Sequence, residues 1–173
     1  MGMPKFLGEL KVKSFLESIV EQFGFPYEEN EGFMYSFSLN NACCQIGYVK
    51  QDKLISKNYN LTVTIEKSIQ QSSSLAQEVD YQFHKRQWRT KRYPTLGNLA
   101  NTHFLMDWDQ VDFSSVKIVE KDQVRKIQME ILPGSYSTLL FPPMSQGIKL
   151  FEEEVEIIKS MIEDISLKLD YAG

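Results

Sequence analysis

The repeat of apolar residues changes along this chain from a helical period to a strand period, and this change constrains the fold more than any other feature. Between residues 8 and 23, apolar residues recur at spacings of three and four, as on one side of a 3.6-residue repeat. These positions are Val12, Phe15, Leu16, Ile19, Val20 and Phe23. Gly24 and Pro26 follow, so we predict a helix over 8–23 that ends at Gly24.

After residue 32 the period is two. Phe33, Tyr35 and Phe37 alternate with other side chains, as expected for a strand with one buried face. The pair Asn40-Asn41 then suits a tight hairpin turn. We therefore predict strands over 33–39, 43–49 and 59–65.

A middle helix is predicted next. Ser74 is a helix-capping residue type, and Leu75, Val79 and Phe83 lie four apart along one face. Pro94 disfavours the helical conformation of the residue before it, so we expect the helix to end before this proline.

The second half of the chain is expected to be mostly strands, over 102–108, 116–119 and 127–132. Pro133-Gly134 fits the central pair of a type II turn, so we expect the chain to reverse there. A returning strand over 136–141 would end at Pro142-Pro143, which cannot donate to a ladder. A long final helix follows, roughly over 148–170, with an apolar face that begins at Phe151 and acidic first turns that suit its dipole.

These elements predict a single α+β domain over residues 1–173. The sheet is expected to be antiparallel, because its connections are mostly short and carry hairpin chemistry. About six or seven strands are expected, flanked by an N-terminal, a middle and a long C-terminal helix.

Composition and charge exclude some classes of protein. Hydrophobic residues make up 42% and charged residues 24%, which is typical of a soluble globular chain. The net charge of −4 disfavours a general nucleic-acid binder. No apolar run resembles a signal peptide or a membrane helix, so we expect a cytoplasmic protein without a membrane partner.

The residues that usually carry catalysis are few. His84 and His103 do not lie in a metal-ligand spacing. Cys43 and Cys44 are neighbours, and a disulfide between them would be strained, so we expect two thiols on opposite faces of a strand. No catalytic residue, metal ligand or cofactor is predicted, and the chain is interpreted as a non-enzyme. A thiol–histidine pair or a zinc site made from all four residues is the less favoured alternative.

Three acidic residues in "MDWDQVD", Asp107, Asp109 and Asp112, raise the question of a metal site. A calcium loop of the EF-hand type would need further oxygen ligands, a central glycine and a closing glutamate, which this stretch lacks. Solvated turn residues are the favoured interpretation, with Trp108 as a packing anchor.

The strongest candidate for partner binding is "FHKRQWRTKRY", residues 83–93, in which five basic residues and three aromatic residues occur without an acidic one. The stretch could be the basic end of the middle helix, with its aromatic side chains in the core. It could also bind an acidic protein segment or, less favoured, single-stranded nucleic acid. The predicted partner-binding residues are Lys85, Arg86, Trp88, Arg89, Lys91, Arg92 and Tyr93.

The order of elements resembles the PsbP-like fold. The resemblance covers roughly residues 33–168 and is carried by element order and hydrophobic pattern. The segments that carry it are "NLTVTIEKSI", "SSLAQEVDYQF", "THFLMDW", "IQMEILPGSYSTLLFPPM" and "FEEEVEIIKSMIEDI". That family is not enzymatic, and it includes photosystem extrinsic subunits, a Ran-binding protein and chaperones for type VI secretion effectors. The element order also resembles type III secretion chaperones, which are small, acidic, cytosolic and dimeric.

Both resemblances imply a binding module, and neither carries site residues over to this chain. The leading hypothesis is therefore a non-enzymatic cytosolic binding or chaperone-type protein that holds a partner protein or peptide on an apolar sheet or groove, with a homodimer left open. Two alternatives are a nucleic-acid binder that uses residues 83–93, and a small-molecule carrier or enzyme with a pocket between sheet and helices.

Overall fold

The computed structural model describes residues 5–68, 81–84, 87–90, 110–121 and 123–169. Over these residues the chain forms two helices and an antiparallel sheet, so the predicted α+β class is confirmed. The helices are α1 (Lys5–Phe23) and α3 (Glu152–Lys168). The strands are β1 (Glu28–Glu29), β2 (Met34–Leu39), β3 (Ala42–Asp52), β4 (Ser56–Ser68), β5 (Tyr81–His84), β6 (Gln87–Thr90), β7 (Phe113–Lys121), β8 (Val124–Leu139) and β9 (Met144–Gly147).

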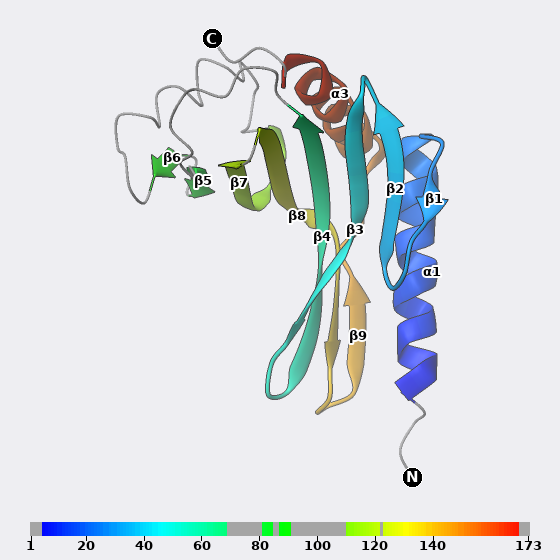
Figure 1. The fold of residues 1–173 in the computed structure, drawn as a ribbon. Helices are drawn as coiled ribbons and strands as arrows, with labels where there is room; N and C mark the ends of the chain where they lie inside the picture. Colours follow the sequence, from blue (N-terminus) through cyan, green and yellow to red (C-terminus); the bar gives the residue numbers. More distant parts are fainter. Residues whose placement is uncertain (1–4, 69–80, 85–86, 91–109, 122, 170–173) are drawn as a thin grey trace.

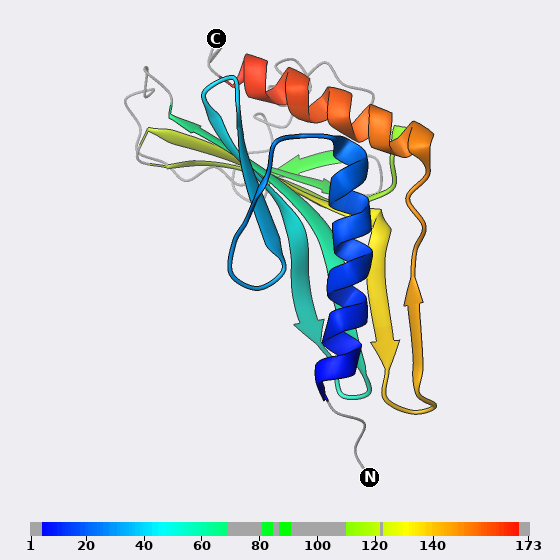
Figure 2. The same ribbon diagram turned by 90° about the vertical axis from the view of Figure 1, so that its right-hand side faces the viewer.

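The sheet has the strand order β1-β2-β3-β4-β8-β7-β5-β6, and β9 also pairs with β8. The described strands number nine, against an expected six or seven, and β1, β5, β6 and β9 have only two to four residues each. Figures 1 and 2 show α1 lying along one face of the sheet and α3 crossing at the end away from the β3–β4 turn.

Helix α1 forms where the helical period predicted it. Its side chains at Val12, Leu16 and Ile19 are at most 2% exposed and face the sheet. The helix ends at Phe23, because Gly24 takes a φ of +66° and its N–H donates to the carbonyl of Glu21 at 3.2 Å.

The first hairpin also follows from local sequence. Asn40 and Asn41 adopt φ values of 51° and 61°, as a tight hairpin turn with two left-handed residues requires. In β3 the period of two places Cys44 in the core and leaves Cys43 exposed, as predicted.

The prediction of a type II turn at Pro133-Gly134 is wrong. Strand β8 continues through these residues without reversing. Its first part pairs with β7 up to Ile131, and its last part pairs with β9 from Tyr136 onward. The two parts therefore lie end to end, and Pro133-Gly134 marks the point at which β8 exchanges one neighbour for another.

A large bulge replaces the predicted turn. Opposite β4, Ile131 pairs with Leu61 and Tyr136 pairs with Tyr59, so residues 132–135 of β8 face only one residue of β4. A bulge of this kind bends a strand and increases its twist. The last part of β8 thus leads away from β7 and along β9.

Polar groups of the bulge form hydrogen bonds with other groups of the protein. The hydroxyl of Ser135 accepts a hydrogen bond from the N–H of Leu61 at 3.0 Å and donates to the carbonyl of Ile131 at 2.8 Å. The hydroxyl of Tyr48 donates to the carbonyl of Gly134 at 2.5 Å. Since an unpaired buried backbone group is costly, these bonds allow the bulge to sit in the interior.

The chain reverses after β8 instead. Leu139 pairs with Met144, and residues 140–143 make the turn into β9. The prediction that Pro142-Pro143 ends the strand agrees with this position, because proline offers no N–H to a ladder.

The middle helix predicted from Ser74 is not seen. Where the structure describes this segment, β5 and β6 form an antiparallel hairpin, and β5 pairs with β7. Phe83, which the prediction placed on a helical face, also lies two residues from Tyr81, and this spacing fits a strand. Residues 74–80, 85–86 and 91–93 of that prediction, and the strand predicted over 102–108, lie outside the described residues.

Helix α3 agrees with the predicted final helix, with one exception. Val155, Ile158, Ile162 and Ile165 are buried, whereas Phe151 precedes the first turn and is 56% exposed. The apolar face therefore begins one turn later than expected. The N–H of Phe151 donates to the carboxylate of Glu154 at 2.8 Å, which caps the start of the helix.

One hydrophobic core joins both helices to one face of the sheet. Alternate strand positions contribute, and the fully buried members include Leu61, Val63 and Ile65 of β4 with Ile127 and Met129 of β8. Neither of the two described helices is both long enough and apolar enough to cross a bilayer.

Candidate functional site

The basic stretch predicted from the sequence is only partly described. Trp88 and Arg89 lie in β6, where they pair in register with Phe83 and Gln82 of β5. Phe83 in turn pairs in register with Val116 of β7. The other predicted partner-binding residues, Lys85, Arg86, Lys91, Arg92 and Tyr93, lie outside the described residues. The assignment of this stretch to a partner stays a prediction.

In the part of the chain that the structure describes, the thiols of Cys43 and Cys44 do not belong to a cluster of side chains that could bind a metal ion. Within the described residues, no group of three or more His, Cys, Asp and Glu side chains could hold a metal ion. Burial raises the pKa of Cys44 to about 12, with a smaller contribution from Cys43. His84 lies in β5, His103 lies outside the described residues, and Asp112 is exposed.

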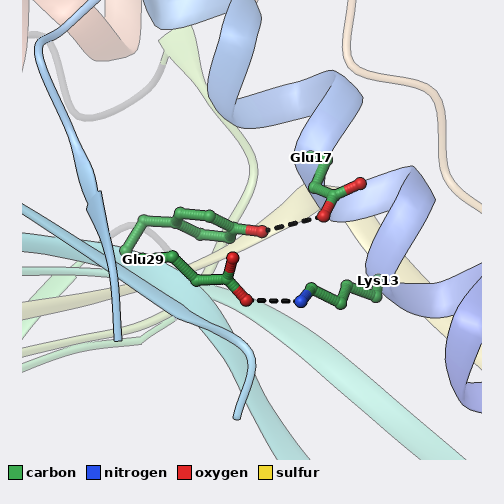
Figure 3. A network of polar contacts seen from close by, with 4 residues as sticks. Lys13, Glu17 and Glu29 are labelled. Carbon is green, nitrogen blue, oxygen red and sulfur yellow. Dashed lines mark hydrogen bonds and ion pairs between the residues drawn. The ribbon is translucent and has the colours of Figure 1, made fainter. Parts of the chain in front are cut away.

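A polar network fastens α1 to the edge of the sheet (Figure 3). Lys13 of α1 forms an ion pair with Glu29 of β1, and the hydroxyl of Tyr35 donates to Glu17 at 3.4 Å. Burial raises the pKa of Tyr35 to about 12, and the negative charge of Glu17 adds to the shift. The hydrogen bond to Glu29 raises the pKa of Lys13. These contacts hold a helix in place and present no open group for chemistry.

The sheet face that points away from the helices is polar in the strands β2, β3, β4, β8 and β7. One row of register partners across them consists of Ser36, Gln45, Thr64, Gln128 and Lys117. All five residues of this row are polar, and Thr64 at its centre is buried. An apolar docking surface on this sheet face, which the leading hypothesis allowed, therefore does not run through the row. The most exposed apolar side chains lie at one end of the sheet.

Two neighbouring turns carry these apolar side chains, and we call them the apolar tip. Leu54 and Ile55 occupy the β3–β4 turn, where they are 95% and 57% exposed. Leu140 and Phe141 occupy the β8–β9 turn, where they are 59% and 85% exposed. Figures 1 and 2 show both turns at the same end of the sheet.

Hydrogen bonds hold the two turns of the apolar tip together. The N–H of Leu140 donates to the carbonyl of Ile55 at 2.9 Å, across the two turns. Within the β3–β4 turn, the N–H of Lys53 donates to the carbonyl of Ser56 at 2.8 Å. The four apolar side chains therefore project from one connected backbone.

Charges of both signs border the apolar tip. The ammonium of Lys50 lies 3.5 Å from the carboxylate of Asp52, and Lys53 is exposed beside Leu54. The β8–β9 side is different, since residues 135–148 carry no charged side chain.

Sequence reasoning missed the apolar tip. Leu139, Leu140 and Phe141 were predicted to belong to the returning strand over 136–141. The signal that identifies them as a surface is the uncharged run around them, combined with a double proline that forces a turn. That signal becomes decisive only when the pairing of β8 with β9 is known.

Comparison with known proteins gives one match. No curated protein and no solved structure matches the chain. A family model described as "Protein of unknown function (DUF3156)" matches residues 21–169, which include the whole described sheet and all of α3. The resemblances to PsbP-like proteins and type III secretion chaperones stay predictions. Because the match covers most of its length, the chain belongs to the DUF3156 family.

Proposed function

We propose that this chain is a non-enzymatic, chaperone-type binding protein that holds a partner protein, and that the apolar tip is the docking surface. The observation that carries the proposal is the exposure of Leu54, Ile55, Leu140 and Phe141, which is 57–95% on two turns joined by a hydrogen bond. Soluble proteins rarely expose contiguous apolar side chains without using them for interaction.

The energetics favour binding at this surface. Complete burial of a Leu, Ile or Phe side chain stabilises a complex by about 1.5–3 kcal/mol. The two turns are already fixed to each other, so docking orders little additional backbone. A surface that is organised before binding loses less conformational entropy when the complex forms.

A protein fits the apolar tip better than a lipid surface does. An anionic bilayer favours a basic border, whereas Asp52 stands here between Lys50 and Lys53. The side chains also sit on turns that project from the sheet, so the partner would supply an apolar pocket with a mixed polar rim. Two unpaired thiols suit a reducing compartment, and the proposal therefore places the protein in the cytosol.

Site-specific photo-cross-linking in the native host tests the proposal. A photoreactive phenylalanine derivative at position 141 is expected to cross-link one defined protein, and the same group at position 38, an exposed position on the polar sheet face, is expected not to. Equal cross-linking at both positions, or cross-links to lipid only, would contradict the proposal.

A further inference from the structure

One edge of β9 remains open among the described strands. β9 pairs with β8 on one side, and none of the other strands that the structure describes pairs with its second side. The N–H of Ile148 donates to the carbonyl of Ser135 at 2.7 Å, and its carbonyl accepts from the N–H of Gly134 at 2.9 Å. Both backbone groups of Ile148 therefore point toward β8.

Backbone direction alternates along a strand of an antiparallel pair, so every second residue directs its N–H and carbonyl to the same neighbour. Counting back from Ile148, Gln146 and Met144 also point to β8. Ser145 and Gly147 then direct their N–H and carbonyl groups to the open edge. This edge can thus form hydrogen bonds with another strand.

The side chains along β9 form a nearly symmetrical pattern about Gln146. A Cβ on Gly147 would lie 2.5 Å from the ring of Phe15, so position 147 faces α1. Met144, Gln146 and Ile148 accordingly face the opposite side. Met144 is 55% exposed and Ile148 is 41% exposed, and each lies two residues from Gln146.

The charge distribution favours a second copy of the chain as the occupant of this edge. Natural edge strands are often protected by charged residues, particularly lysine. Residues 135–148 carry no charge. A two-fold contact brings like surfaces together, and an uncharged edge meets its own copy without repulsion.

We propose that β9 pairs antiparallel with β9 of a second copy, around a two-fold axis at Gln146. Ser145 of each copy exchanges hydrogen bonds with Gly147 of the other, and Met144 of each copy faces Ile148 of the other. The two sheets then join into one. This interface does not include the apolar tip, so it goes beyond the proposed function and can fail independently of it.

Sedimentation velocity of the full chain, in the presence of a reductant because Cys43 is exposed, tests this register. The wild-type chain is expected to dimerise reversibly. Met144→Glu and Ile148→Lys, each alone, are expected to weaken dimerisation at least tenfold. An equimolar mixture of these two variants is expected to recover a heterodimer, because the introduced glutamate faces the introduced lysine while one native Met–Ile pair remains.

Two further variants serve as controls. Ser145→Pro removes an outward N–H and is expected to weaken the dimer, whereas Ser145→Ala keeps this group and is expected to leave it intact. Leu140→Glu places a charge on the apolar tip and is expected not to affect dimerisation. Circular dichroism verifies that each variant is folded.

Three results would overturn the proposal. The first is a wild-type chain that stays monomeric at about 0.5 mM, a concentration at which even a small specific interface should associate. The second is dimerisation unchanged in both single variants, which would place the contact elsewhere. The third is a mixture no more dimeric than either variant alone.

Discussion

Gly134 occupies the most demanding backbone position of the β8 bulge. Its φ is +83°, and a Cβ there would lie 2.7 Å from Cδ2 of Leu61. Gly24 provides a matched comparison, because its φ is +66° but a Cβ would meet nothing within 4 Å. The two positions separate backbone strain from crowding.

We expect Gly134→Ala to destabilise the protein more than Gly24→Ala does. Left-handed strain alone costs about 1–2 kcal/mol at either position. Overpacking against Leu61 adds about 1–3 kcal/mol at position 134 only. Urea unfolding followed by circular dichroism measures both free energies. Equal costs would show that the bulge is not packed against Leu61.

The two adjacent thiols should differ in reactivity. Cys44 is fully buried and its pKa is raised to about 12, whereas Cys43 is exposed on the other face of β3. A thiolate is the reactive species, and a buried thiol forms it rarely at pH 8. We expect an aromatic disulfide reagent to titrate one thiol in the native protein and the second only after unfolding.

Cys43→Ser is expected to abolish the fast reaction, and Cys44→Ser to preserve it. Two rapid equivalents in the native wild-type chain would place both side chains at the surface, which would contradict the register of β3.

At the scale of single elements, the attachment of α1 to the sheet predicts a loss of stability at high pH. Burial, aided by the charge of Glu17, raises the pKa of Tyr35 to about 12. Burial also raises the pKa of Tyr48 and of Tyr59. An unfolded tyrosine loses its proton near pH 10, whereas the folded protein keeps it, so the unfolded state binds fewer protons above pH 10.

The contribution of these tyrosines to the free energy of unfolding should therefore be constant below pH 10 and be lost between pH 10 and 12. For Tyr35 alone the loss is on the order of 2 kcal/mol. Tyr35→Phe is expected to make this fall shallower, and denaturant titrations at several pH values measure it. An unchanged slope in Tyr35→Phe would contradict a buried, protonated tyrosine under α1.

The elements that the sequence predicts well are those that local rules determine. The spacing of Val12, Leu16 and Ile19 requires a helix that buries one side, and the pair Asn40-Asn41 supplies the left-handed residues of a hairpin. Because these signals lie within a few residues of each other, the distant part of the chain does not change their outcome.

Predictions from local sequence fail where pairing between strands that are distant in the sequence determines the structure. Pro133-Gly134 satisfies the local rule for a turn, but the pairing of β8 with β4, β7 and β9 prevents the strand from reversing there. Likewise, Phe83 fits a helical face and a strand equally well, and its pairing with Val116 selects the strand. Local patterns could not identify the apolar tip, because an apolar run alone does not tell a buried strand from an exposed turn.

On the scale of the whole molecule, the two proposed surfaces lie on different parts of the sheet. The apolar tip is formed by the β3–β4 and β8–β9 turns, whereas the open edge follows β9 toward α3 (Figure 2). An antiparallel pairing of two β9 strands would direct the two tips to opposite ends of the joined sheet.

If the apolar tip holds a partner protein, substitutions in the tip must weaken the affinity for that partner. With the cross-linked partner purified, isothermal titration calorimetry compares the wild-type chain with the Leu54→Asp/Phe141→Asp double variant and with Ser38→Asp, an exposed position on the polar face. Both variants should unfold within about 0.5 kcal/mol of the wild-type chain, since these changes are on the surface. We expect the double variant to bind at least tenfold more weakly, a loss of about 1.4 kcal/mol or more, and Ser38→Asp to bind like the wild-type chain. Undiminished affinity of the double variant would contradict partner binding at the apolar tip.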